Sequence, residues 1–149
     1  EVVHGVTAQA AASSLTGLQN YRFGPATTLP FPSSHGADGL PGSLTETVEA
    51  NAERGLHTLV FLDIKAAEDR YLRASDGAAL LAEQYADRLG VVVARAGSDE
   101  PVVVADRIEQ LAAQSFGPPL HLLVLPGELH PMERDALRAF ADAPDAARD

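Results

Sequence analysis

The chain has 149 residues, of which 46% are hydrophobic and 21% charged, and this describes one soluble globular domain. It contains no cysteine, which excludes disulfides, thiolate nucleophiles and cysteine-ligated zinc. The net charge of −10 argues against nucleic-acid binding, because 11 cationic residues oppose 21 acidic ones and no basic cluster is visible that could neutralise phosphates.

No segment predicts a membrane span or a secretion signal, so we expect no membrane partner and a cytoplasmic location. The acidic composition, with Lys65 as the only lysine, favours a halophilic source, because acidic surfaces stay hydrated in concentrated salt. The first residue is Glu1, and Val2-Val3-His4-Gly5 resembles the end of a strand already under way. We therefore expect the chain to be a piece of a longer protein.

The first half of the sequence predicts helices and strands in alternation. The expected elements are a strand end at Val2-Val3, a helix from Ala8 to about Leu15, a strand from Thr27 to Phe31, a loop over 33–42, a helix to about Arg54, and a strand from Thr58 to Ile64. Thr7 is suited to cap the first helix, and Gly17 and Gly55 are suited to end the two helices. Ser43-Leu44-Thr45-Glu46 has the pattern of a capping box.

The second half continues the alternation. The expected elements are a helix capped by Ser75-Asp76 and ended by Gly90, a strand from Val91 to Ala96, an extended Val102-Val103-Val104, a helix from about Asp106 to Gln114, a strand from His121 to Leu125, and a last helix from Pro131 to about Ala141. The tail 144–149 is expected to be frayed. The alternation predicts an α/β domain with a mixed, largely parallel sheet and flanking helices.

Ligands of open α/β sheets bind beyond the carboxyl ends of the strands. Three junctions are expected at such ends, namely Asp63-Ile64-Lys65, Ala96-Gly97-Ser98 and Pro126-Gly127-Glu128. The pattern alone is as consistent with ordinary turns as with a ligand cleft.

Other kinds of site find little support. The five histidines are scattered, without the spacing of a zinc site, and no nucleophile elbow, Walker loop or dinucleotide-binding glycine motif occurs. His121 follows Phe116-Gly117-Pro118-Pro119-Leu120 at the start of an apolar strand. On pattern alone, such a histidine is more often a hydrogen-bonded core residue than a ligand contact.

Six segments, taken together, resemble the diphthine synthase family in its archaeal type. They are Thr16–Gly24, Glu53–Leu59, Leu62–Lys65, Ala94–Ser98, Phe116–His121 and Pro126–His130. They occur in the family's order, and the resemblance extends over roughly His4 to Phe140. It implies the tetrapyrrole methylase fold, in which two α/β domains hold a cofactor in the cleft between them.

The resemblance also implies a function. The family transfers methyl groups from S-adenosylmethionine to the amino group of a modified histidine on translation elongation factor 2, giving diphthine and S-adenosylhomocysteine, and its members are typically homodimers. The family's glycine-rich first strand and first acidic cofactor contact have no counterpart here. We therefore expect residues 1–24 to be the end of the first domain and the crossover, 25–143 the C-terminal α/β domain, and 144–149 a tail.

Matched residue by residue, the family's cofactor contacts fall on Thr7, Ala8, Leu62, Ala96 and His121. Thr7 and Ala8 match least well, because this chain has His-Gly-Val-Thr-Ala where relatives often have His-Ala-Pro-Ser-Ile. His121 is expected to hydrogen-bond the adenine or the ribose. No catalytic residue is implied, because the sulfonium is already activated and the protein mainly positions the amine.

Two other readings remain open at this point. One is a related methylase acting on a tetrapyrrole precursor. Such an enzyme is not expected to contain the segment Phe116–His121 at this place in its sequence. The other is a catalytically silent domain that dimerises or binds a partner protein. The absent first half favours the silent domain for the chain as it stands.

Overall fold

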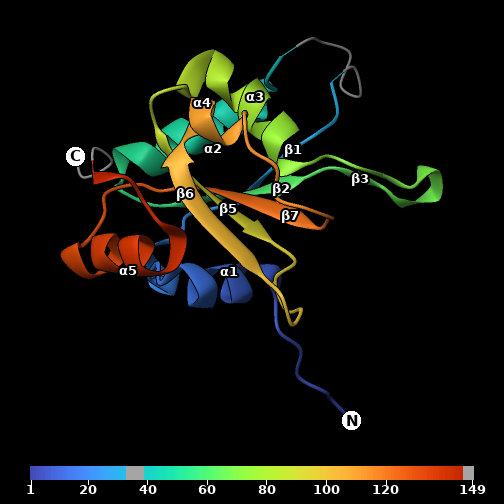
Figure 1. Ribbon diagram of the computed structural model, residues 1–149, viewed down its shortest axis with the longest axis horizontal. Coiled ribbons are helices and arrows are strands. Elements are labelled where there is room, and N and C mark those ends of the chain that lie inside the picture. Colours follow the sequence, from blue (N-terminus) through green and yellow to red (C-terminus); the bar gives the residue numbers. More distant parts are fainter. Residues whose placement is uncertain (33–38, 146–149) are drawn as a thin grey trace.

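The computed structural model describes residues 1–32 and 39–145 and contains a five-stranded sheet with helices on both faces (Figure 1). The strand order is β1-β2-β7-β5-β6. The strands are β1 (Thr27–Leu29), β2 (Thr58–Leu62), β5 (Leu89–Ala94), β6 (Val102–Arg107) and β7 (His121–Leu125). A separate two-stranded ribbon of β3 (Ile64–Lys65) and β4 (Arg70–Tyr71) extends from the body of the domain (Figure 1).

The predicted α/β class with a mixed sheet and flanking helices is confirmed, but the parallel share is smaller than expected. Strands β1 and β2 pair in parallel, whereas β2–β7, β7–β5 and β5–β6 pair antiparallel. The difference arises because β7 inserts between β2 and β5 and runs against both. The alternation of strands and helices along the sequence does not reveal this insertion.

Each face of the sheet carries its own hydrophobic core. Helices α2 (Gly42–Glu53), α3 (Ala74–Tyr85) and α4 (Ile108–Leu111) lie on one side, and α1 (Ala8–Thr16) and α5 (Pro131–Ala141) lie on the other (Figure 1). Along β7 the side chains alternate between the two cores, because successive residues of a strand point to opposite faces. Leu123 and Leu125 belong to the first core, and Val124 belongs to the second.

Several local predictions are confirmed. Thr7 caps α1, with its hydroxyl oxygen accepting from the N–H of Ala10 at 3.2 Å, and Gly17 ends the helix at φ 75°. Gly55 follows α2 in the left-handed conformation, at φ 69°. The strand from His121 and the helix from Pro131 have the predicted bounds.

Other local predictions are wrong. Helix α2 starts at Gly42 without a side-chain cap, so the capping box at Ser43 does not form. Gly90 lies inside β5 instead of ending α3, and a Cβ at this residue would collide with Ile108 of α4. The strand predicted from Thr58 to Ile64 breaks at Asp63, and Val2-Val3 forms no strand.

Three further bounds differ from the predictions. Helix α4 is a single turn, β5 ends at Ala94, and β1 stops at Leu29. Most of the predicted loop 33–42, and most of the tail 144–149, lie outside the described residues. Within residues 1–32 and 39–145, no helix has both the length and the apolar character that crossing a bilayer requires.

Candidate functional site

The carboxyl ends of β2 and β5 meet at one edge of the sheet, together with the start of β7. The register pairs Phe61 of β2 with Leu122 of β7, and Ala94 of β5 with His121 of β7. Two of the three predicted junctions, 63–65 and 96–98, therefore lie at this edge. The third, 126–128, lies at the opposite edge, because β7 is antiparallel to its neighbours. The expectation that all three share one edge is wrong for that reason.

A cleft opens beyond this edge, on the face that carries α1. It is lined by Val6, Thr7, Ala8, Ala11, Ala96, Gly97, Leu120 and Leu122. Its volume is about 590 Å³, open solvent included. Three of the five predicted cofactor contacts, Thr7, Ala8 and Ala96, thus come together from two segments almost ninety residues apart.

The walls of the cleft have a consistent chemical character. Most of the lining side chains are small or apolar, and Val6 and Leu120 expose 85% and 52% of their surface at the rim. The first turn of α1 adds polarity, because the first N–H groups of a helix have no acceptor within it and carry partial positive charge. Such a cleft accommodates a flat apolar group that has a polar edge.

His121 lies at the same edge, but its ring points to the other face of the sheet, where it is 5% exposed. Its Nδ1 accepts from the N–H of Ala74, the first residue of α3, at 3.0 Å. The Nε2–H therefore donates to the carbonyl oxygens of Gly117 and Pro118, at 3.1 and 3.0 Å. Burial lowers the pKa of His121 below its ordinary value of 6.5, and the two carbonyls oppose this only in part. Both ring nitrogens are thus engaged within the protein.

Leu62 also lies at this edge and on the same face as His121. It is 6% exposed and packs in the core under α3, where its side chain approaches Gly77. Thr7, Ala8 and Ala96 therefore line the cleft. Leu62 and His121 lie on the opposite face of the sheet.

The junction at Asp63 performs a local structural task. The Asp63 carboxylate accepts from the backbone N–H of Phe31 at 3.0 Å. Lys65 and Arg70, from the two strands of the ribbon, lie over the Phe31 ring at 5.5 and 4.5 Å from its centroid. These contacts attach the β3–β4 ribbon to the end of β1.

A buried ion cluster that the sequence did not predict occupies the opposite edge. His57 Nε2 and Glu133 Oε2 are 2.6 Å apart, and both side chains are fully buried. The N–H of Gly127 donates to His57 Nδ1 at 2.9 Å, so the Nε2–H of a neutral ring donates to the carboxylate. Glu133 also accepts the backbone N–H groups of Gln19 and His130, at 2.9 and 3.0 Å.

The protonation states follow from these contacts. Burial lowers the pKa of His57 below its ordinary value of 6.5, although Glu133 acts in the opposite direction. Burial alone would raise the pKa of Glu133, but its donors, Gln19, His130 and His57, outweigh this and hold the pKa below 4.5. The cluster joins the segment after α1, the start of β2 and the start of α5. The two partners are 76 residues apart in the chain, and no motif or spacing in the sequence points to their pairing.

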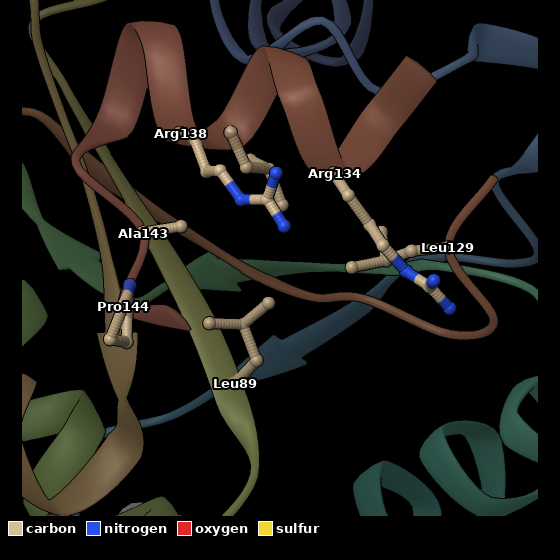
Figure 2. Close-up of a pocket in the computed structure, with 7 residues that line it drawn as sticks. Leu89, Leu129, Arg134, Arg138, Ala143 and Pro144 are labelled. Carbon is tan, nitrogen blue, oxygen red and sulfur yellow. The ribbon is translucent and has the colours of Figure 1, made fainter. Parts of the chain in front are cut away.

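A smaller pocket lies on the α5 face near the start of β5 (Figure 2). Its walls are Leu89, Leu129, Arg134, Leu137, Arg138, Ala143 and Pro144. Figure 2 shows Arg134 and Arg138 reaching from α5 toward Leu129 and Leu89, so that their stems cover apolar surface. None of the predicted site residues lines this pocket. Among the described residues, no group of three or more His, Asp or Glu side chains could hold a metal ion.

By its fold the chain is an α/β domain with a cleft at the carboxyl ends of β2 and β5. No family model matches the chain. It is 65% identical over 143 residues to the diphthine synthase of Haloquadratum walsbyi, covering 96% of this chain and 55% of that protein. It is 63% identical over 149 residues to that of Halobacterium salinarum, covering 96% of this chain and 57% of that protein.

A solved structure agrees with these relatives. A crystal structure of a diphthine synthase superposes with a TM-score of 0.86 at 37% identity, covering 98% of this chain and 56% of that one. The chain belongs to the diphthine synthase family, as the resemblance implied, and spans about half the length of the curated relatives it matches.

Proposed function

We propose that this chain forms the C-terminal part of an S-adenosylmethionine-dependent diphthine synthase. The reaction is methyl transfer to the amino group of the modified histidine of translation elongation factor 2, which forms diphthine in diphthamide biosynthesis. The observation that supports this most is the identity of up to 65%, maintained over nearly the whole chain, to proteins named for that activity. The protein would act as a cytoplasmic homodimer, with the elongation factor as its protein partner.

The cofactor contacts proposed are Thr7, Ala8, Leu62, Ala96 and His121. Adenosine has a flat, mainly apolar base with a polar edge, and the small side chains of Ala8 and Ala96 leave room for it between α1 and the end of β5. Leu62 and His121 would support the edge from the other face of the sheet. For the His121 ring to bind adenosine directly, it would have to release Ala74 or the 117–118 carbonyls.

The cofactor, when bound, supplies an already activated methyl group. The task left to this chain is to hold the cofactor, to exclude water from it, and to keep the accepting amine in line. The apolar rim at Val6 and Leu120 suits the exclusion of water. No general acid or base is assigned, since the lining side chains include no titratable group.

The two alternatives have less support. A methylase of tetrapyrrole precursors would share the fold, but the similar proteins carry the name diphthine synthase. A silent domain would have no need for a cleft at which the residues proposed as cofactor contacts, Thr7, Ala8 and Ala96, come together. A measurement of S-adenosylhomocysteine binding separates the silent domain from the proposal, whereas the methylase of tetrapyrrole precursors is set aside by the names of the similar proteins alone.

The experiment is calorimetric titration of S-adenosylhomocysteine into the 149-residue chain in molar potassium chloride. Ala96→Leu places a large side chain in the cleft, and Ala139→Leu makes the same change on the exposed surface of α5. We expect binding to the parent and to Ala139→Leu, with loss of at least about tenfold in affinity for Ala96→Leu. Equal binding by Ala96→Leu would contradict the placement of the cofactor. Absence of binding to a folded parent would contradict a cofactor site formed by this chain alone.

A further inference from the structure

The loop 116–120 forms one wall of the cleft through Leu120. Arg95, which immediately precedes the facing wall 96–97, holds two of the loop's backbone carbonyls. Nη1 of Arg95 donates to the carbonyl oxygens of Phe116 and Pro118, at 2.8 and 2.6 Å. Hydrogen bonds from a charged donor are about twice as strong as neutral ones. The half-buried guanidinium therefore fixes the loop more firmly than an ordinary polar contact would.

The backbone of Arg95 makes a third connection between the same two segments. Its N–H donates to the carbonyl oxygen of Leu120 at 2.7 Å. Arg95 also has a φ of 51°, in the left-handed region that non-glycine residues seldom occupy. This conformation directs the chain out of β5, so that Ala96 and Gly97 line the cleft directly opposite Leu120.

The loop is shaped around the guanidinium. Gly117 has a φ of 77°, and a Cβ at this residue would lie 3.1 Å from Arg95 Nη1. A side chain at 117 would therefore press on the group that holds the loop. Arg73 and His121 donate to the carbonyl of Gly117 from the α3 side, at 3.0 and 3.1 Å, so the loop is also held from that face of the sheet.

We propose that Arg95 is a positioning residue that sets the spacing between the two walls of the cleft, 96–97 and 120–122. That the ligand is the adenosyl cofactor rests on the function proposed above. Lysine would not replace Arg95 fully, because a point charge on a flexible stem lacks the fixed planar directions of the guanidinium. Arg95 touches the loop and not the ligand, so it acts through the loop.

The test compares Arg95→Met, Arg95→Lys and Arg107→Met with the parent chain. Arg107 is the matched control, since it lies at the far end of β5–β6, paired with Leu89, and makes one long ion pair of 3.8 Å with Asp87. Two quantities are measured: the affinity for S-adenosylhomocysteine, and amide hydrogen exchange at 117 and 120–122. A thermal melt of each variant confirms that it is folded.

For Arg95→Met we expect about tenfold weaker binding and about tenfold faster exchange of the loop amides, with Arg95→Lys between this variant and the parent. Arg107→Met should match the parent in both. Unchanged exchange and affinity in a folded Arg95→Met would overturn the proposal. If the parent binds no S-adenosylhomocysteine, a cofactor site formed by this chain alone is contradicted, and the exchange rates still decide whether Arg95 positions the loop.

Discussion

The two edges of the sheet each contain a buried histidine, and the two histidines have different partners. At the far edge, His57 donates to the carboxylate of Glu133, and the pair is fully enclosed. At the cleft edge, His121 joins a helix N-terminus to the carbonyls of Gly117 and Pro118, and its partners carry no charge. The cluster at the far edge therefore connects the segment after α1 with the starts of β2 and α5. At the cleft edge, the loop 116–120 is anchored by the buried Phe116 and by hydrogen bonds to its backbone carbonyls, with no ion pair among these contacts.

The largest effect is expected at the far edge. Glu133→Ala leaves the N–H groups of Gln19 and His130 and the ring of His57 without their acceptor inside the protein. Removing one member of a buried charged network costs about 3 to 5 kcal/mol in the free energy of unfolding. Denaturant unfolding checks this, with the exposed Glu46→Ala on α2 as the control, for which no change is expected. A similar midpoint for both variants would show that the cluster does not hold the segments together.

A smaller loss is expected for His121→Ala. The N–H of Ala74 loses its acceptor, and the carbonyls of Gly117 and Pro118 lose a donor. Buried groups left unpaired cost about 1 to 3 kcal/mol. The same unfolding measurement applies, and His121→Gln is the informative comparison, because its amide can restore one contact. If S-adenosylhomocysteine affinity fell without any loss of stability, His121 would contact the ligand directly.

Stability should also depend on pH in a defined window. The pKa values of His57 and His121 are lowered in the folded state, so below pH 6.5 the unfolded chain binds protons that the folded chain does not. The stability is complete above pH 6.5 and falls as the pH decreases below it. Below pH 4.5, the lowered pKa of Glu133 adds a second loss in the same direction. Unfolding midpoints between pH 8 and pH 4 test this.

A control distinguishes the buried histidines from the exposed one in the N-terminal segment. Since His4 is exposed, His4→Gln should leave the pH profile unchanged. In His57→Gln and in His121→Gln, the slope between pH 6.5 and pH 5 should decrease. If the slope of stability against pH were identical in all variants, groups other than these histidines would cause the loss of stability in acid.

The smallest effect is expected at the cap of α1. Thr7→Ala removes the acceptor of the Ala10 N–H, an exposed hydrogen bond of 3.2 Å. Losing such a cap costs about 1 kcal/mol. Thr7→Ser retains the hydroxyl and should keep the stability of the parent in thermal unfolding. A Thr7→Ser variant as unstable as Thr7→Ala would mean that the methyl group, and not the cap, matters.

Much of the local structure could be predicted because its cause is local. Thr7, Gly17 and Pro131 act on the helix turn beside them, so the ends of α1 and the start of α5 were predictable. The capping box at Ser43 was wrong since α2 has Pro41 as its N-cap, two residues before Ser43. The start of α3 was wrong for a tertiary reason, since its first N–H is bound by His121, 47 residues away in the chain.

The amino-acid sequence by itself determined the α/β class, the acidic surface and the family, since composition, periodicity and short motifs carry these. It also indicated Thr7, Ala8 and Ala96, which meet in one cleft. Only the tertiary structure decided the antiparallel insertion of β7, and with it which junctions share an edge. It likewise decided the pairing of His57 with Glu133 and the contact of Arg95 with the 116–118 carbonyls. These depend on which distant segments become neighbours, and that is determined by burying both faces of the sheet at once.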